Sequence, residues 1–358
     1  MRSGKRVSGR IIMAELCATL CLASGIAQNS FDSLLESGVK LAQQERYREA
    51  VQVFEKCVQK DPASFEAHYN LALALFAVDR LPEARHAIQA ASEGRQSEQL
   101  AKQYLLGKID EALGNLSDAR RELSLAFDGS QDEENYALDL GLLMIRQTDY
   151  PGAMQVFARA SQVHPQSPYV MLGLAMAQAL GGKPGQAAET CKLILKNQPA
   201  FSPARLLMAF SHYMSGEYEQ AERVAASGLR SSSASPYLYY VDAAALLKLN
   251  SADYTRMLQE LDVAERGIQS CALCYFVRSK VHQAAGDLPA AILDLETLVS
   301  RIAPDFDQAW YRLASLYQRA GRQEDSRTAR AKFEAIKTLE SDPDSQLIRT
   351  MLLPSLRR

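Results

Sequence analysis

The stretch of sequence that decides the fold is DQAWYRLASLYQRAGRQEDS, residues 307–326. Its apolar side chains Trp310, Leu313 and Tyr317 stand three to four residues apart, so they share one face of a helix. Gly321 follows the last apolar position, and glycine there is typical of the left-handed residue that ends a helix. The stretch therefore predicts one amphipathic helix, a tight turn and the start of a second helix.

Ser326, in the second of these helices, closes a series of mostly small residues that runs back along nearly the whole chain. The steps between its members are 34 to 36 residues, and the members are Ala50, Ala84, Ala119, Ala153, Ala187, Ala221, Met257, Ala291 and Ser326. Glycines precede the series by five residues at Gly114, Gly182, Gly216, Gly286 and Gly321. A small residue at a fixed step marks the close packing of paired helices, so the chain is predicted to be an array of helical hairpins.

The prolines support the same division of the chain. They fall in the expected first helical turn (Pro82, Pro151, Pro184, Pro289), just past a helix end (Pro62, Pro165, Pro199, Pro304) or at the next helix start (Pro168, Pro203, Pro236). A proline inside a helix costs about 3 kcal/mol, and none of these lies inside an expected helix.

The combined pattern resembles the tetratricopeptide repeat family, in which a large residue, a Leu-Gly pair and a Tyr precede an Ala, a Phe and a Pro. The residues that carry the resemblance are Trp310, Leu313, Ala314 and Tyr317 near the C-terminus, the pairs Leu106-Gly107 and Leu140-Gly141, and Leu34, Gly38, Leu41, Ala50, Phe54 and Pro62. The resemblance implies an all-α, right-handed superhelical solenoid of about nine hairpins. The expected repeats are 31–64, 65–99, 100–133, 134–167, 168–201, 202–235, 236–271, 272–306 and 307–340.

The repeat at 236–271 departs most from the pattern. Asn250-Ser-Ala-Asp replaces its glycine turn, it has two extra residues, and Thr255 stands near the expected small position. We interpret it as a degenerate repeat; the alternative is a local change in the curvature of the solenoid. Residues 341–358 are expected to form a capping tail, with a docking peptide for a partner as the alternative.

The first residues have the composition of an export signal. Four cations lie within residues 1–10, and an apolar run from Ile11 to Ile26 follows. This arrangement predicts a secretory signal peptide at 1–27, cleaved after Ala27. Glu15 interrupts the apolar run, and an uncleaved membrane anchor is the alternative. We expect an exported protein, periplasmic or secreted, of bacterial origin.

Composition and motifs exclude several classes of function. Lys and Arg number 40 against 42 Asp and Glu, so no basic face for nucleic acid is expected. The sequence has no metalloprotease, phosphate-loop or nucleophile-elbow motif, and we predict a protein that is not an enzyme and has no cofactor or metal.

The pair Cys271 and Cys274 leaves three alternatives open. The favoured interpretation is two small apolar residues at a helix start, the second is a disulfide, and the third is a redox or metal role. Cys57 and Cys191 occupy apolar repeat positions and are expected to be unpaired core residues.

In the family, the first helix of each repeat lines a concave surface. By this resemblance the expected partner-binding groove is apolar and aromatic, and it consists of Tyr69, Leu73, Phe76, Tyr104, Leu142, Tyr169, Met176, Phe210, Tyr213, Tyr240 and Phe276. Such a surface favours a protein or peptide partner. The expected function is an exported scaffold, within an envelope assembly or a secretion complex. The alternative is an accessory subunit of an enzyme that processes polysaccharide or peptidoglycan.

Overall fold

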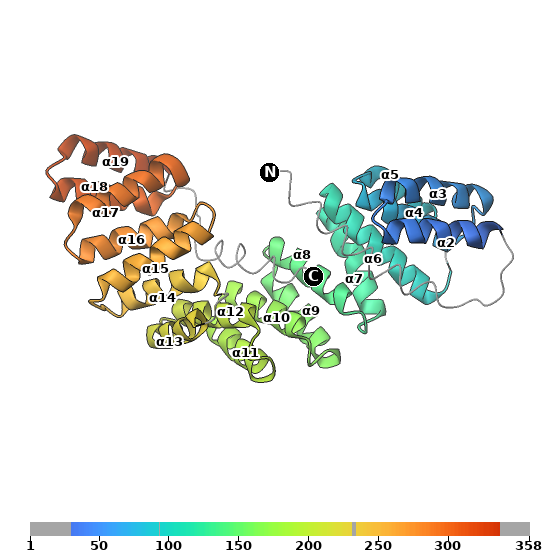
Figure 1. The fold of residues 1–358 in the computed structure, drawn as a ribbon, viewed down its shortest axis with the longest axis horizontal. Helices are drawn as coiled ribbons and strands as arrows, with labels where there is room; N and C mark the ends of the chain where they lie inside the picture. The colour runs from blue at the N-terminus through green and yellow to red at the C-terminus, as the bar shows by residue number, and fades with distance from the viewer. Residues whose placement is uncertain (1–29, 93, 231–233, 337–358) are drawn as a thin grey trace. The chain divides into compact units, whose positions relative to one another are not determined.

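The structure is a computed structural model that describes residues 30–92, 94–230 and 234–336 (Figure 1). Within these ranges it contains 18 α-helices and no strand, so the predicted all-α fold is confirmed. The expected signal peptide at 1–27 and the expected capping tail at 341–358 lie outside the described residues.

The chain divides into two compact units, of which the N-terminal unit ends at Pro165 and the C-terminal unit begins at Gln166. The N-terminal unit contains α2 (Ser30–Gln43), α3 (Tyr47–Lys60), α4 (Phe65–Ala77), α5 (Leu81–Ala90), α6 (Gln96–Leu113), α7 (Leu116–Gly129), α8 (Glu134–Arg146) and α9 (Tyr150–Val163). Consecutive helices pack against each other as a series of hairpins.

The C-terminal unit continues the same arrangement. It contains α10 (Pro168–Leu180), α11 (Pro184–Asn197), α12 (Ser202–Met214), α13 (Tyr218–Leu229), α14 (Pro236–Lys248), α15 (Tyr254–Gly267), α16 (Ala272–Ala284), α17 (Leu288–Thr297), the π-helical turn η1 (Leu298–Ile302), α18 (Asp307–Arg319) and α19 (Gln323–Ile336).

The mostly small residues predicted to mark the hairpins lie in the core. All nine members of the series are buried, including Met257 and Ser326. The glycine of each Leu-Gly pair explains the close packing: a Cβ added to Gly107 would lie 2.7 Å from Leu123 on the partner helix. The prediction of close helix pairs is therefore confirmed in detail.

The turn inside each hairpin contains one residue with a positive φ. Five of these residues are the predicted glycines, such as Gly182 with φ 76°. Glu45, Asp79 and Thr148 take the same place in three other repeats, with φ between 59° and 63°. The left-handed turn is thus a property of the hairpin, and glycine is one of several residues that fill it.

The degenerate repeat follows the same rule with a longer turn. Asn250 has the positive φ, 55°, and the side chain of Asp253 then caps α15 by accepting from the backbone N–H of Arg256. Met257 is fully buried in the place that alanine occupies elsewhere, whereas Thr255 is exposed. The two extra residues therefore lie in the turn, and Met257 stays at the buried position of the small-residue series.

One helix start differs from the predicted repeat boundary. Helix α6 begins at Gln96, four residues before the expected start at 100. The side chain of Glu98 accepts a hydrogen bond of 2.9 Å from the backbone N–H of Arg95, which caps the helix at this earlier position.

Candidate functional site

The predicted apolar groove is mostly core. Nine of its eleven side chains are less than 10% exposed: Tyr69, Leu73, Phe76, Tyr104, Leu142, Met176, Phe210, Tyr240 and Phe276. Tyr169 and Tyr213 keep partial exposure. Neighbouring hairpins cover these nine side chains, so they do not form a contiguous exposed apolar patch, and their role in binding a partner stays a prediction. The rings of Tyr104 on α6 and Tyr136 on α8, for example, lie 4.7 Å apart between their centroids.

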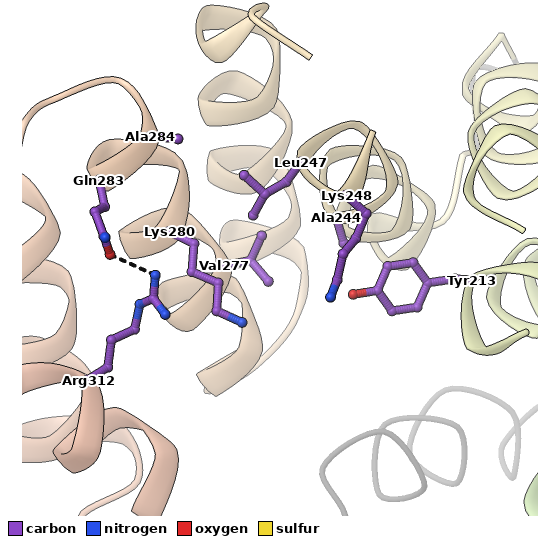
Figure 2. A pocket seen from close by; sticks show the side chains of 9 residues that line it. All are labelled: Tyr213, Ala244, Leu247, Lys248, Val277, Lys280, Gln283, Ala284 and Arg312. Carbon is purple, nitrogen blue, oxygen red and sulfur yellow. Dashed lines mark hydrogen bonds between the residues drawn. The ribbon is translucent and has the colours of Figure 1, made fainter. Parts of the chain in front are cut away.

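An open cavity does exist in the C-terminal unit (Figure 2). It has a volume of about 310 Å³ and lies between the first helices of four successive hairpins, α12, α14, α16 and α18. We call it the basic cavity, and it is lined by Tyr213, Ala244, Leu247, Lys248, Val277, Lys280, Gln283, Ala284 and Arg312.

The charged side chains that line the basic cavity among the described residues are all positive. Lys248, Lys280 and Arg312 contribute three cations, and none of the described residues that line it carries a carboxylate. Figure 2 shows the three side chains entering the same space from α14, α16 and α18. Like charges gathered in a recess attract an anionic ligand, because the low-dielectric walls strengthen their combined field.

Arg312 is the most constrained of these cations. Its Nη2 donates to Oε1 of Gln283 at 2.7 Å, while its Nε is buried and has no hydrogen-bond partner among the described residues. Burial and, to a smaller extent, the nearby charge of Arg319 lower the pKa of Arg312. Arginine still remains protonated at physiological pH, so Arg312 presents a partly desolvated positive charge to the cavity.

Aromatic rings position the two lysines. The Nζ of Lys280 lies 4.0 Å from the ring centroid of Phe276, and that of Lys248 lies 5.9 Å from the ring centroid of Tyr218. A ring face attracts an ammonium group but leaves its charge in place. The buried Phe276 of the predicted groove thus contacts one of the lysines that line the cavity.

In the N-terminal unit, two cations at the corresponding repeat positions pair with acids. Lys108 occupies the same repeat position as Lys280, and its Nζ lies 2.7 Å from Oδ1 of Asp139. Arg146 occupies the same position as Lys248, and it pairs with Glu111. Acids of the same unit neutralise both side chains.

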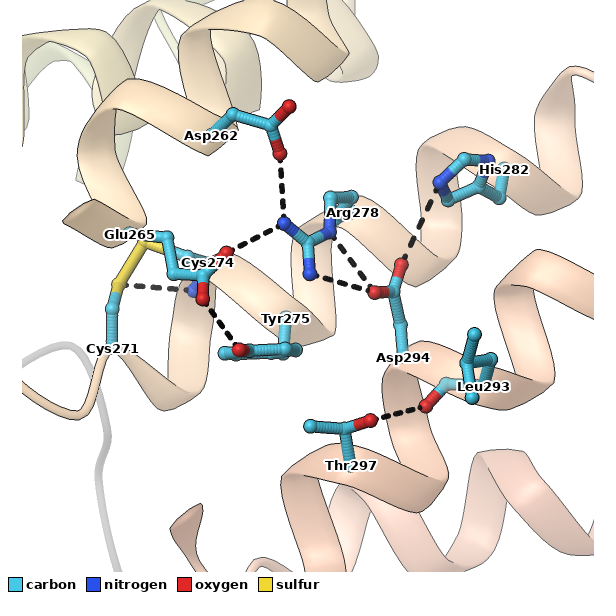
Figure 3. A network of polar contacts seen from close by, with 10 residues as sticks. All are labelled: Asp262, Glu265, Cys271, Cys274, Tyr275, Arg278, His282, Leu293, Asp294 and Thr297. Atoms are coloured by element: carbon cyan, nitrogen blue, oxygen red, sulfur yellow. Dashed lines mark hydrogen bonds and ion pairs between the residues drawn. A yellow bond between two sulfur atoms is a disulfide. The ribbon is translucent and has the colours of Figure 1, made fainter. Parts of the chain in front are cut away.

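The cysteine pair is a disulfide next to a polar network (Figure 3). Cys271 and Cys274 are bonded and buried, and Cys271 is the N-cap of α16. The favoured interpretation was right about burial and the helix start and wrong about the free thiols. Within the described residues, Cys57 and Cys191 are free and buried as predicted, and burial raises the pKa of both thiols.

Other kinds of site have no support in the described part of the chain. None of its helices has the length and apolar character needed to cross a membrane. No group of three or more His, Cys, Asp or Glu side chains there is arranged to hold a metal ion.

The sequence contained part of the signal for the basic cavity. Lys280 and Tyr213 stand at positions that the resemblance assigns to the concave surface, and so do Lys248 and Gln283. Arg312 is the sixth residue of its repeat, a position outside that assignment. A comparison of the ninth and thirteenth positions of successive repeats would have found Lys280 and Lys248 but not Arg312.

Comparisons with known proteins agree with the hairpin architecture. Models described as tetratricopeptide repeat match residues 41–103, 144–202, 202–227 and 276–343. A tetratricopeptide repeat protein from Parabacteroides merdae is similar in structure, with a TM-score of 0.51 and 17% identity, over 70% of this chain and 98% of that one. Yeast Tom70 aligns with a TM-score of 0.47 and 16% identity, over 98% of this chain and 69% of that one.

One curated relative matches by sequence. The peroxisomal targeting signal receptor of Saccharomyces cerevisiae is 24% identical over 200 residues. The match covers 53% of this chain and 32% of the receptor, so the chain spans about a third of that relative's length.

Proposed function

Because the chain belongs to the tetratricopeptide repeat family, we propose that it is a non-catalytic scaffold that holds an acidic segment of a protein partner in the basic cavity. Proteins built from this repeat are typically non-catalytic and serve protein–protein interaction. The observation that carries the proposal is the cavity itself, where three cations and no carboxylate line the described wall.

The chemistry of the wall indicates what the segment contains. A carboxylate bound in the cavity would pair with the guanidinium of Arg312 or with a lysine ammonium, and hydrogen bonds between charged groups are the strong ones. Leu247, Val277 and the ring of Tyr213 offer apolar surface next to the cations. A peptide with an acidic residue beside an apolar one matches both features. The yeast relative is a receptor for a targeting signal, which fits a chain that captures a segment of another protein.

We further infer that the scaffold is exported and acts in an envelope assembly or a secretion complex. The composition of residues 1–27 supports this location. The disulfide between Cys271 and Cys274 also supports it, since disulfides persist mainly in oxidising compartments. The alternative role beside a polysaccharide-processing enzyme would favour acids on the working surface, and the described cavity wall has none.

The test is a pull-down from the native envelope fraction with the chain from residue 28 onward. The cavity variant is K248Q/K280Q/R312Q, and the matched control K192Q/K196Q/R223Q removes three exposed cations that lie outside the cavity wall. We expect the control to capture the same protein as wild type and the cavity variant to lose it. Added salt should weaken capture by wild type, because screening acts on exposed charges.

Equal capture by both variants, with helicity unchanged, would refute the basic cavity as the binding site. If wild type captures no specific protein from the envelope fraction or from whole-cell extract, the scaffold role itself is refuted.

A further inference from the structure

Two buried carboxyl groups in the interior of the C-terminal unit contact the same arginine. Asp242 on α14 is fully buried, and Glu260 on α15 is 8% exposed. Each has one oxygen that is buried without a hydrogen-bond partner among the described residues, Oδ1 of Asp242 and Oε2 of Glu260. Two orphaned acceptors on neighbouring acids are costly when both acids are ionised, because neither can donate to the other.

One cation serves both acids. Arg256 on α15 pairs with Oδ2 of Asp242, and its Nε donates to Oε1 of Glu260 at 3.0 Å. The same guanidinium lies 3.5 Å from Oε1 of Glu222 on α13. Three acids therefore surround one arginine, and the group has an excess of negative charge when all three are ionised.

On the adjacent helices α12 and α16, Arg278, His282 and His212 contact acids other than Asp242 and Glu260. On α16, Arg278 and His282 face Asp294 on α17. On α12, His212 contacts Glu217. The balance of charge around the pair thus depends on Glu222, Arg256 and the state of the two carboxyl groups.

We propose that Asp242 and Glu260 share one proton through their orphaned oxygens, and that its loss at raised pH loosens the α14–α15 hairpin. A shared proton gives one carboxyl group an O–H that donates to the other, which satisfies both oxygens and removes one buried charge. We call this pair, Asp242 and Glu260, the carboxyl latch. When it holds a proton, its two carboxyl groups hydrogen-bond to each other, and when both are ionised they repel each other.

The direction of the pH dependence follows from the same groups. Burial, followed by the hydrogen bond and charge of Asp242, raises the pKa of Glu260 to about 8 from its ordinary 4.5. Burial also raises the pKa of Asp242. A carboxyl group with a raised folded pKa contributes stability that is complete below about pH 4.5 and is lost as the pH rises through about 8.

The latch has a link to the basic cavity, and this part of the inference rests on the proposed function. Helix α14 carries Asp242 and also Ala244, Leu247 and Lys248 of the cavity wall. Loosening of α14 would therefore move part of that wall.

Hydrogen exchange of the α14 and α15 amides tests the latch without any partner. Protection, corrected for the intrinsic rate, is compared below about pH 5 and above about pH 8 in wild type, E260Q, D242N and the exposed control E219Q. We expect protection in wild type and E219Q to fall by at least about tenfold. Protection in E260Q should stay nearly constant, because the glutamine amide donates to Asp242 as the protonated acid does, and D242N should behave alike.

A fall of equal size in E260Q and D242N would overturn the proposal, and so would constant protection in wild type. For the link to the cavity, capture of the partner above about pH 8 should be weaker in wild type than in E260Q. Equal capture would overturn the link alone. Absence of capture at every pH would instead refute the proposed function and leave the exchange result standing.

Discussion

Gly141 on α8 lies directly against the ring of Phe157 on α9, and a Cβ added to Gly141 would lie 2.4 Å from two carbons of that ring. Real side chains do not come so close, so the hairpin depends on the absence of a side chain at this point. Gly38 and Phe54 repeat the relationship in the first hairpin, where the distance would be 2.5 Å.

The first prediction concerns this contact. Gly141→Ala should lower the free energy of unfolding by about 1–2 kcal/mol, because overpacking outweighs the gain in helix propensity. Urea unfolding followed by circular dichroism measures the effect. The control is Gly185→Ala, where a Cβ meets nothing within 4 Å and no loss is expected. Phe157→Leu combined with Gly141→Ala should cost less than the sum of the two single changes; simple additivity would contradict the contact.

The second prediction concerns Thr148, a β-branched residue with φ 62°. The left-handed conformation costs a residue with a Cβ about 1–2 kcal/mol, and glycine avoids that cost. Thr148→Gly should therefore stabilise the protein by about 1 kcal/mol, somewhat less than the full strain because glycine is freer when unfolded. Thr148→Ala keeps the strain and serves as the control. A Thr148→Gly variant no more stable than Thr148→Ala would show that the turn is unstrained.

The third prediction concerns the number of cysteines that react with an alkylating agent before and after reduction. The chain has six cysteines, and the structure pairs Cys271 with Cys274. Alkylation of the denatured protein purified from its native compartment should modify two thiols, Cys57 and Cys191, before reduction and four after it. A chain that retains residues 1–27 would also contain Cys17 and Cys21. Mass spectrometry of the intact protein therefore tests the disulfide and the removal of the signal peptide together.

The fourth prediction concerns reduction of the disulfide, which closes a loop of four residues. A loop this short constrains the unfolded chain only modestly, and reduction should cost about 2 kcal/mol. The variant C271S/C274S should unfold at lower urea and become insensitive to dithiothreitol. An unchanged wild-type midpoint under reductant would contradict a stabilising role for the bond.

Most of the fold could be predicted because its signals are local. The turn glycines, the prolines of the first helical turns and the buried alanines each report on a few neighbouring residues. Ala119 and Gly114, for example, identify one hairpin without reference to the next. The start of α6 was missed because it depends on a side chain, Glu98, that caps the helix four residues early.

The candidate site was harder to predict because exposure depends on how neighbouring hairpins cover each position. Leu73 and Lys280 are both the ninth residue of their repeats, yet Leu73 is fully buried and Lys280 lines the basic cavity. There was also no sign in the sequence that Asp242 and Glu260 share Arg256. Asp242 lies 14 positions and Glu260 four positions from Arg256, and only packing brings the three together. The spacing of Cys271 and Cys274 suited free thiols as well as a bond.

The lengthened turn between α14 and α15 has a practical consequence for experiments on this chain. Two additional residues are accommodated between Asn250 and Asp253, while Met257 keeps its buried place. Exposed turns of this kind tolerate insertion well. A short epitope or a fluorophore site placed between Ser251 and Ala252 would report on the C-terminal unit while leaving both chain ends in their natural form.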